Sequence, residues 1–341
     1  MKHTRKASCA LFAGLIGGAP VGGAQAAETV DIYGVIGIHA GSIKRSGESA
    51  SSRVINGGGL QTSFLGFKGQ EDLGGGLKAL FALESFFRPD TGESGRNATD
   101  PFFSRNAWVG IEGDFGRLSL GRQTNPTYGV MSQLSPFGAS VVFSPLTVQS
   151  FVVPYGRNIL GDSVWDNVLK YATPNLQGFQ GSLLYGRGEV AGKSGYANTG
   201  AHATYRSGKF MGALSVQRVR VNGTTVLAEP QRAWLAGATY DFGPLKLHGN
   251  TVRTRIDGGS STRLHDLGLS VPVSAPGKLL LETARSRIDA PNVPDVRRTT
   301  TSFGYDHRLS KRTDVYAIYS HDRKTGQSSA NSFAVGIRHM F

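Results

Sequence analysis

The sequence has one cysteine, Cys9, which lies in an apolar stretch near the N-terminus. The chain beyond that stretch therefore has no disulfide, no thiol nucleophile and no cysteine ligand for a metal. A long uninterrupted apolar run is also missing, which excludes transmembrane helices. Aromatic residues are plentiful, with 18 Phe, 11 Tyr and 3 Trp, so the chain is expected to fold rather than stay disordered.

The formal net charge of +13 is typical of a protein that meets polyanions, such as nucleic acid, anionic lipid or acidic solutes. The N-terminus decides between these classes. Lys2, Arg5 and Lys6 precede an apolar segment at 7–16, and the tripeptide Ala-Gln-Ala follows at 24–26. This order predicts a cleaved signal peptide over 1–26 and a mature, exported chain over 27–341, which has no need for a nucleic-acid partner.

Short turn signals recur along the chain at 71–76 (EDLGGG), 113–116 (GDFG), 174–178 (PNLQG), 207–209 (SGK), 242–244 (FGP), 275–277 (APG) and 309–312 (LSKR). The last five lie about 34 residues apart, which is an internal repeat. Between the turns the pattern has a period of two: Phe179, Leu183 and Tyr185 share one face, whereas Gln180 and Ser182 share the other. That is the pattern of strands, and it excludes a helical repeat.

Each repeat is therefore a strand, a longer loop, a strand and a short turn. Seven turns joining eight such units predict an all-β fold, a 16-stranded antiparallel transmembrane β-barrel. The alternative is a secreted β-sandwich, which would lack the even spacing. The terminal alternation over 333–341 ends in Phe341 and resembles the C-terminal signal that the barrel-assembly machinery reads.

Several segments resemble, in the same order, the trimeric porins of β-proteobacteria such as Neisseria, Bordetella and Burkholderia. They are 31–36 (DIYGVI), 66–69 (GFKG), 71–79 (EDLGGGLKA), 121–123 (GRQ), 171–178 (YATPNLQG), 309–314 (LSKRTD) and 335–341 (VGIRHMF). The resemblance implies a homotrimer in the Gram-negative outer membrane, without a cofactor. Each barrel would be a water-filled general diffusion channel for small hydrophilic solutes, narrowed by an inward-folded third loop at about 123–162.

Charge at this constriction is expected to set ion preference, because a narrow opening focuses the electric field. No acidic residue lies between 115 and 161. We predict an anion-preferring constriction built from Arg105, Arg122 and Arg157, with Lys68 and Lys170 on the wall. Alternation and the family pattern also place Lys78 and Arg338 toward the lumen. Arg117 lies beside a short turn, where we expect a rim residue.

One departure bears on this prediction. The family has an arginine where this chain has Phe64, so we expect one constriction charge to be lost and an aromatic patch gained. Asp31 and Glu84 are expected to offset part of the lumen charge. Arg253 and Arg255 end a strand near a loop, where we expect them to meet lipopolysaccharide phosphates.

Other functions have weaker support. A barrel hydrolase needs a nucleophile and a base held together, and the fragment 161–163 (GDS) lacks the G-x-S-x-G pattern. The histidines form no H-x-x-x-H or H-E-x-x-H frame, so no metal site is expected. A solute-specific channel or a surface adhesin stays open as an alternative. The loops at 42–52 and 91–100 are short and polar, which favours a general pore.

Overall fold

The computed structural model describes residues 29–189, 191, 196–222 and 225–341. The predicted signal peptide lies outside this range. The strands form one sheet of 18 segments: β1 (Thr29–Ile43), β2 (Ser52–Gly57), β3 (Phe64–Gly74), β4 (Leu77–Arg88), β5 (Glu93–Ser94), β6 (Asn106–Gly113), β7 (Gly116–Thr124), β8 (Val164–Ala172), β9 (Phe179–Arg187), β10 (Ala197–Ser207), β11 (Phe210–Asn222), β12 (Thr225–Asp241), β13 (Lys246–Ile256), β14 (Ser261–Pro272), β15 (Gly277–Ala290), β16 (Val293–Arg308), β17 (Thr313–Lys324) and β18 (Ala330–Met340).

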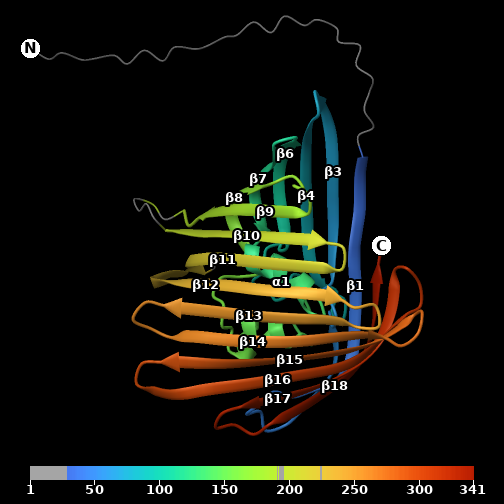
Figure 1. Cartoon of the computed structure of the whole chain (residues 1–341), viewed down its shortest axis with the longest axis vertical. Coiled ribbons are helices and arrows are strands. Elements are labelled where there is room, and N and C mark those ends of the chain that lie inside the picture. The colour runs from blue at the N-terminus through green and yellow to red at the C-terminus, as the bar shows by residue number, and fades with distance from the viewer. Residues whose placement is uncertain (1–28, 190, 192–195, 223–224) are drawn as a thin grey trace, which may run out of the picture.

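These 18 segments correspond to sixteen strands of one barrel. β2 and β3 both pair with β1 and together form one crossing, whereas the two-residue β5 pairs with the end of β4. The first strand closes the sheet onto the last, in a register from Val35 opposite Met340 to Ser42 opposite Phe333. The predicted closed antiparallel barrel of sixteen strands is confirmed (Figure 1).

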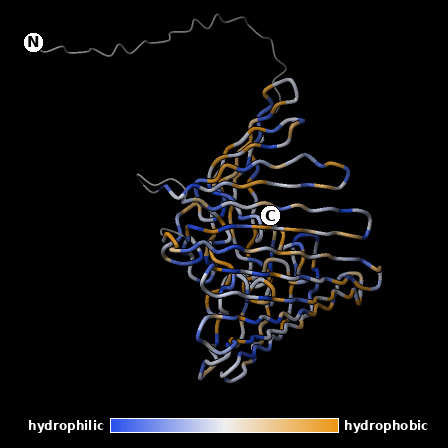
Figure 2. Tube along the Cα trace, turned by 60° about the vertical axis from the view of Figure 1, so that its left-hand side comes forward, coloured by the Kyte–Doolittle hydropathy of each residue, from blue (hydrophilic) through white to orange (hydrophobic). Residues whose placement is uncertain are grey.

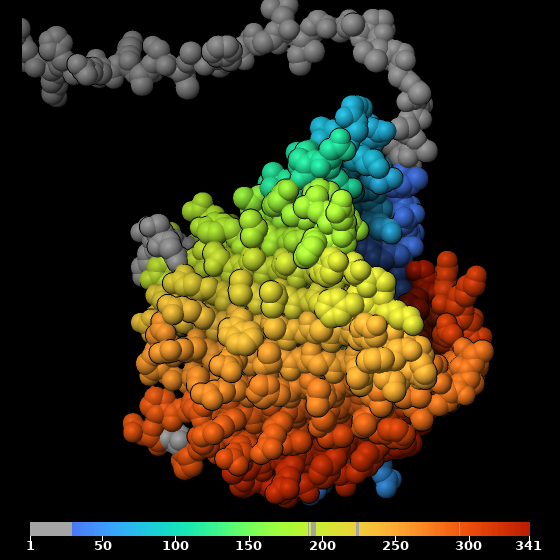
Figure 3. Space-filling view, viewed as in Figure 1, coloured from blue at the N-terminus to red at the C-terminus, as the bar shows by residue number. Residues whose placement is uncertain are grey.

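Hydrophilic and hydrophobic residues follow one another along the strands, as the colours of Figure 2 show. On β11 and β14 the exposed positions include Leu214, Val216 and Leu267. The intervening positions, such as Ser215 and Asp266, are buried. An apolar outer face and a polar inner face are what a barrel in lipid requires. Figure 3 shows the strands from β10 to β18 as one continuous wall toward the viewer.

The helices of the described residues lie in the loop between β7 and β8, which holds α1 (Pro126–Leu134), α2 (Pro145–Phe151) and the 3-10 turn η1 (Val153–Tyr155). In the part of the chain that the structure describes, no helix is long and apolar enough to cross a membrane. This loop is the one predicted at about 123–162, and the strand ends place it at 125–163.

Two leucines on opposite faces give a test of this arrangement. Leu235 on β12 is fully buried, whereas Leu267 on β14 is 67% exposed. We expect Leu235→Ala to lower the free energy of unfolding by about 2–5 kcal/mol, because it leaves a cavity. Leu267→Ala should cost less than about 1 kcal/mol, because lipid fills the space. Urea unfolding in lipid vesicles measures both. Equal effects would contradict the assigned faces.

Candidate pore constriction

The two ends of the loop at 125–163 lie side by side and are joined by hydrogen bonds. The Asn125 backbone N–H donates to the Ser163 carbonyl at 2.9 Å, and the Asn125 side-chain amide donates to the Asp162 carbonyl at 2.5 Å. Asn125 also caps α1 by accepting a hydrogen bond from the Tyr128 backbone N–H at 2.7 Å. Ser144 caps α2 in the same way through the Thr147 N–H. Closed ends and capped helices give this long loop a defined shape.

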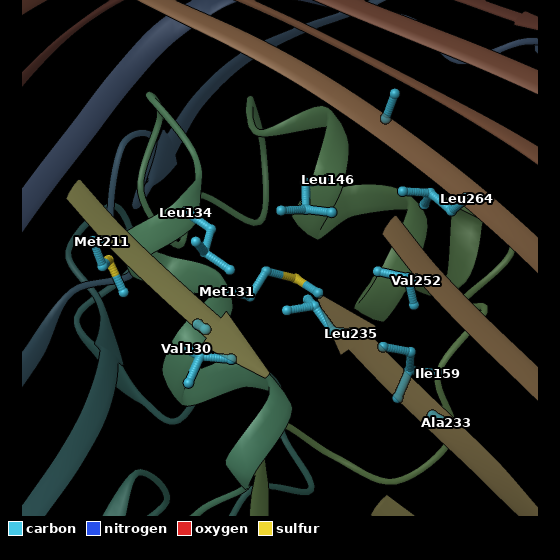
Figure 4. Close-up of a cluster of buried hydrophobic side chains, with 12 residues drawn as sticks. Val130, Met131, Leu134, Leu146, Ile159, Met211, Ala233, Leu235, Val252 and Leu264 are labelled. Carbon is cyan, nitrogen blue, oxygen red and sulfur yellow. The ribbon is translucent and has the colours of Figure 1, made fainter. Parts of the chain in front are cut away.

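An apolar cluster attaches the loop to the wall. Val130, Met131, Leu134, Leu146 and Ile159 of the loop pack against side chains of β11 to β15, as Figure 4 shows. The wall residues are Met211, Ala213, Ala233, Leu235, Val252, Leu264 and Ala284. They belong to the face opposite the exposed leucines, so the loop lies against the inner side of the wall.

Small wall residues allow this close approach. A Cβ placed on Gly237 would lie 2.7 Å from a methyl carbon of Leu134 and closer still to the Asn250 side chain. A second cluster joins Phe137 and Phe143 of the loop to Tyr316 and Ile318 on β17. The loop therefore occupies the inner side from β11 round to β17.

Polar contacts fix the loop further. His248 and Asn250 on β13 each contact the Leu134 carbonyl at 3.1 Å, which satisfies the C-terminal end of α1. Ser135 and Ser144 donate to the Glu282 carboxylate at 2.8 and 3.3 Å. Glu282 is fully buried, so these hydroxyls replace the water that it loses. Most of these contacts lie on β11 to β17, and the Phe143 ring also meets the His39 ring of β1 with their centres 5.6 Å apart. The opposite inner wall is formed by β3, β4 and β6.

That opposite wall carries Arg105 beside the predicted departure, Phe64. The Arg105 guanidinium lies 4.1 Å from the centre of the Phe64 ring and pairs with Glu84 at 2.5 Å. Glu84 also accepts hydrogen bonds from the Tyr33 hydroxyl at 2.5 Å and from the Asn106 amide. Phe64 thus supports the remaining arginine by a cation–π contact. This role of the ring was not predicted from the sequence.

The predicted lysines lie on inner-face register positions around the barrel. Lys68 on β3 is opposite Asp31 and 3.6 Å from its carboxylate, and Lys78 on β4 is opposite Glu112. Lys170 on β8 is opposite Ser119. Among the described residues, no carboxylate lies within 4.0 Å of Lys78, Lys170 or Arg157.

Arg338 on β18 is also inward, opposite Gly37, but Asp314 pairs with it at 2.7 Å. Lys278 likewise meets Asp306 at 3.1 Å. Sequence reasoning missed these inward acids, because only the register of the closed barrel brings each one to its partner. They cancel part of the lumen charge. Arg157 takes a positive φ of 39° in the loop and donates to the Asn222 side chain at the end of β11, at 3.2 Å.

Arg122, predicted in the constriction, lies on β7 opposite Ala107, beside a register shift between Gly121 and Gln123. Its guanidinium donates to the Ser104 carbonyl at 2.9 Å, pairs with Asp166 and lies 3.8 Å from the carboxylate of Asp162 at the end of the long loop. Its side chain is 12% exposed, and its part in the constriction stays a prediction. Arg117, expected at the rim, pairs with Glu112 at 2.7 Å.

A clamp between two loops was not predicted. Arg96, after β4, forms hydrogen bonds with Asp100 at 2.8 Å and with Asp162, at the end of the long loop, at 2.6 Å. Burial alone would raise the pKa of both carboxyls, but the hydrogen bonds from Arg96 outweigh it and hold each pKa below its ordinary value. Residues so far apart in sequence give no signal for such a contact.

Removal of the clamp should loosen the long loop. We expect Arg96→Gln to lower the free energy of unfolding by about 1–3 kcal/mol, because it leaves two carboxylates without their partner. The matched control is Arg88→Gln, which breaks a pair with the exposed Glu93. That change should cost less than about 1 kcal/mol. Urea unfolding of both variants checks the difference.

The contribution of the clamp to the stability of the fold should depend on pH. A carboxyl with a lowered pKa stabilises the folded state at pH values above its ordinary pKa of 3.8. This stabilisation is lost as the pH falls through the lowered value, because both acids then become protonated. The difference in stability between wild type and Arg96→Gln should therefore be full at pH 7 and shrink below about pH 4. An unchanged difference at the acid end would contradict this assignment.

Comparison with known proteins agrees with the geometry. A family model described as Gram-negative porin matches residues 10–327. Outer membrane porin protein 32 of Delftia acidovorans is 29% identical, over 94% of this chain and 96% of the relative. An outer membrane porin protein of Bordetella pertussis is 28% identical over the full length of both chains. The solved anion-selective porin from Comamonas acidovorans superposes with a TM-score of 0.78 at 27% identity, covering 92% of this chain and 100% of that one.

The described residues hold no group of three or more His, Cys, Asp or Glu side chains arranged for a metal ion. The wall, the inward polar face and the family match all fit a diffusion channel. The chain belongs to the Gram-negative porin family, and it is a porin of the outer membrane rather than an enzyme.

Proposed function

We propose that this general diffusion channel prefers anions among small hydrophilic solutes. The observation that carries the proposal is the combination of a segment without acids over 115–161 and inner-wall cations that form no ion pair among the described residues. A narrow, low-dielectric opening lined by unpaired cations attracts anions and repels cations. The Comamonas porin is described as anion-selective, which supports the same preference here.

The proposed filter differs from the one predicted. Within the described parts of the chain, Lys170, Arg157 and Lys78 form no ion pair, and Lys68 pairs only loosely with the exposed Asp31, at 3.6 Å. Arg105 is part of the proposed filter although it pairs with Glu84, whereas the charge of Arg338 is neutralised by Asp314. Arg122 is left out, because Asp166 and Asp162 neutralise its charge. The proposed filter is therefore a set of cations dispersed over the inner wall and the loop, in place of a compact ring of arginines.

Reversal potentials in planar bilayers across a tenfold salt gradient test the filter. We expect an anion-side potential for the wild type. Lys170→Gln and Arg157→Gln should each lower the anion-to-cation permeability ratio by about twofold, because each removes one charge from a weakly screened opening. Arg122→Gln is the control and should leave the ratio unchanged. A cation-side potential in the wild type, or a fall for Arg122→Gln alone, would overturn the assignment.

We also propose the partners that the family resemblance implies. The channel is a homotrimer, and the barrel-assembly machinery recognises the segment 333–341, which ends in Phe341. Phe341 exchanges two backbone hydrogen bonds of 3.2 Å with Gly34, so the terminal residue takes part in closing the wall. An assembly signal at this seam would be read before the barrel closes.

Lipopolysaccharide is the proposed lipid partner. Arg253, Arg263, Arg287 and Arg297 lie opposite one another on β13 to β16, at exposed positions toward the connections at 257–260 and 291–292. Like charges directly across strands repel, so such a row favours a bound polyanion. Arg287 already pairs with Asp289 and Asp295, and Arg253 lies over the Trp234 ring at 5.5 Å. The phosphates of lipopolysaccharide in the outer leaflet have the required charge.

A double variant tests this lipid site. Arg253→Gln with Arg263→Gln should reduce the lipopolysaccharide retained through purification by about three- to tenfold, since two phosphate contacts are lost. Arg308→Gln with Arg312→Gln, near a short turn on the opposite rim, is the control and should retain the lipid. Phosphate analysis of the purified protein gives the result. Equal retention in both double variants would contradict the site.

A further inference from the structure

A cavity on the inner wall is left unexplained by ion preference. It has a volume of about 530 Å³ and lies on β1, β3, β4 and β6, between the short turns and the level of Arg105. This size lies within the range of small-molecule sites, which run from roughly 300 to 1,000 Å³. Its lining joins aromatic rings to cations, a combination that a pore for inorganic ions does not need.

One register row forms the floor of the cavity. Asp31, Lys68, Ala82 and Trp108 lie opposite one another on four adjacent strands. Lys68 and Trp108 are thus two strand spacings apart, about 10 Å between Cα atoms. Ala82 lies between them and has only a methyl group. A cation, a shallow gap and an indole ring therefore follow one another across the wall.

Cations also hold the rings in place. The Lys68 ammonium lies 5.1 Å from the centre of the Tyr33 ring, and the Arg117 guanidinium lies 5.6 Å from the centre of the Trp108 ring. The Tyr33 hydroxyl is fixed on Glu84, and its ring meets Phe64 edge-on at 5.9 Å. Rings fixed in this way lose little conformational entropy when a planar ligand packs against them.

The three cations differ in how firmly they are held. Arg105 pairs with Glu84 at 2.5 Å, and Arg117 pairs with Glu112 at 2.7 Å. Lys68 is 3.6 Å from Asp31, and the two side chains are 53% and 62% exposed. A loose pair between exposed groups contributes little stability and is readily exchanged. Lys68 is therefore the cation available to a carboxylate that enters the cavity.

We propose that this cavity is a binding site for an aromatic monocarboxylate of about the size of benzoate. The carboxylate would pair with Lys68, and the ring would lie over Ala82 against Trp108. Asp31 and Glu84 also line the cavity, so a second negative charge would be repelled. The inference rests on the proposed anion-preferring channel, and it deepens that proposal by naming one class of solute.

The test is block of single-channel current by benzoate, with equilibrium dialysis of radiolabelled benzoate against the purified protein. We expect benzoate to bind at least about fivefold more tightly than cyclohexanecarboxylate, which has the same charge and a non-aromatic ring. Acetate and benzamide should bind more weakly still. Trp108→Leu and Lys68→Gln should each weaken benzoate binding by about five- to tenfold.

Matched controls separate this site from the general filter. Lys246→Gln removes an inner-wall lysine of β13 outside the cavity, and Trp234→Leu removes an exposed indole of the outer face; both should keep benzoate binding. Equal binding of benzoate and cyclohexanecarboxylate, or full binding in Trp108→Leu, overturns the proposal. The reversal potential in potassium chloride is measured separately. A channel that prefers anions but does not bind benzoate rejects this site and leaves the proposed ion preference intact. If the channel prefers cations, equilibrium dialysis still shows whether benzoate binds at this site.

Discussion

The structure depends on backbone hydrogen bonding in a medium without water. In lipid, an unpaired strand edge would leave a row of N–H and C=O groups unsatisfied, so the sheet must close on itself. β1 and β18 meet that requirement along their register, and Phe341 completes it through Gly34. Closure in turn creates a narrow polar interior, fixes which side chains face it and gives the long loop a wall to pack against. The site therefore exists because the sheet has no free edge.

Most of the fold could be predicted from the sequence, because lipid and water impose a local rule. Lipid demands an apolar side chain at every second position, as at Leu214 and Val216, and short turns recur at even spacing. Both signals lie within single strands. The long loop was predictable for a similar reason, since its length and its lack of acids are properties of one continuous segment.

The charge pattern of the site was predicted less well, because it depends on pairing between strands. Asp306 and Asp314 neutralise cations that lie on neighbouring strands, and the sequence alone does not give that register. Arg122 is neutralised by Asp166 and Asp162, which come from the next strand and from the end of the long loop. Arg96 and Asp162 meet only after two loops have folded. Phe64 gained a role that no motif contained, because its partner, Arg105, comes from a separate segment.

The long loop packs mainly against one side of the barrel, and this has a consequence for how the sequence can change. Most side chains that anchor the loop come from β11 to β17, whereas the unpaired lysines and the aromatic cavity come from residues before 173. Most of the support of the loop and most of the solute contacts are thus encoded in different halves of the chain. Substitutions on the inner face of the first half can retune which solutes pass while the loop keeps its support. Divergence of solute preference among related channels can proceed there without loss of the scaffold.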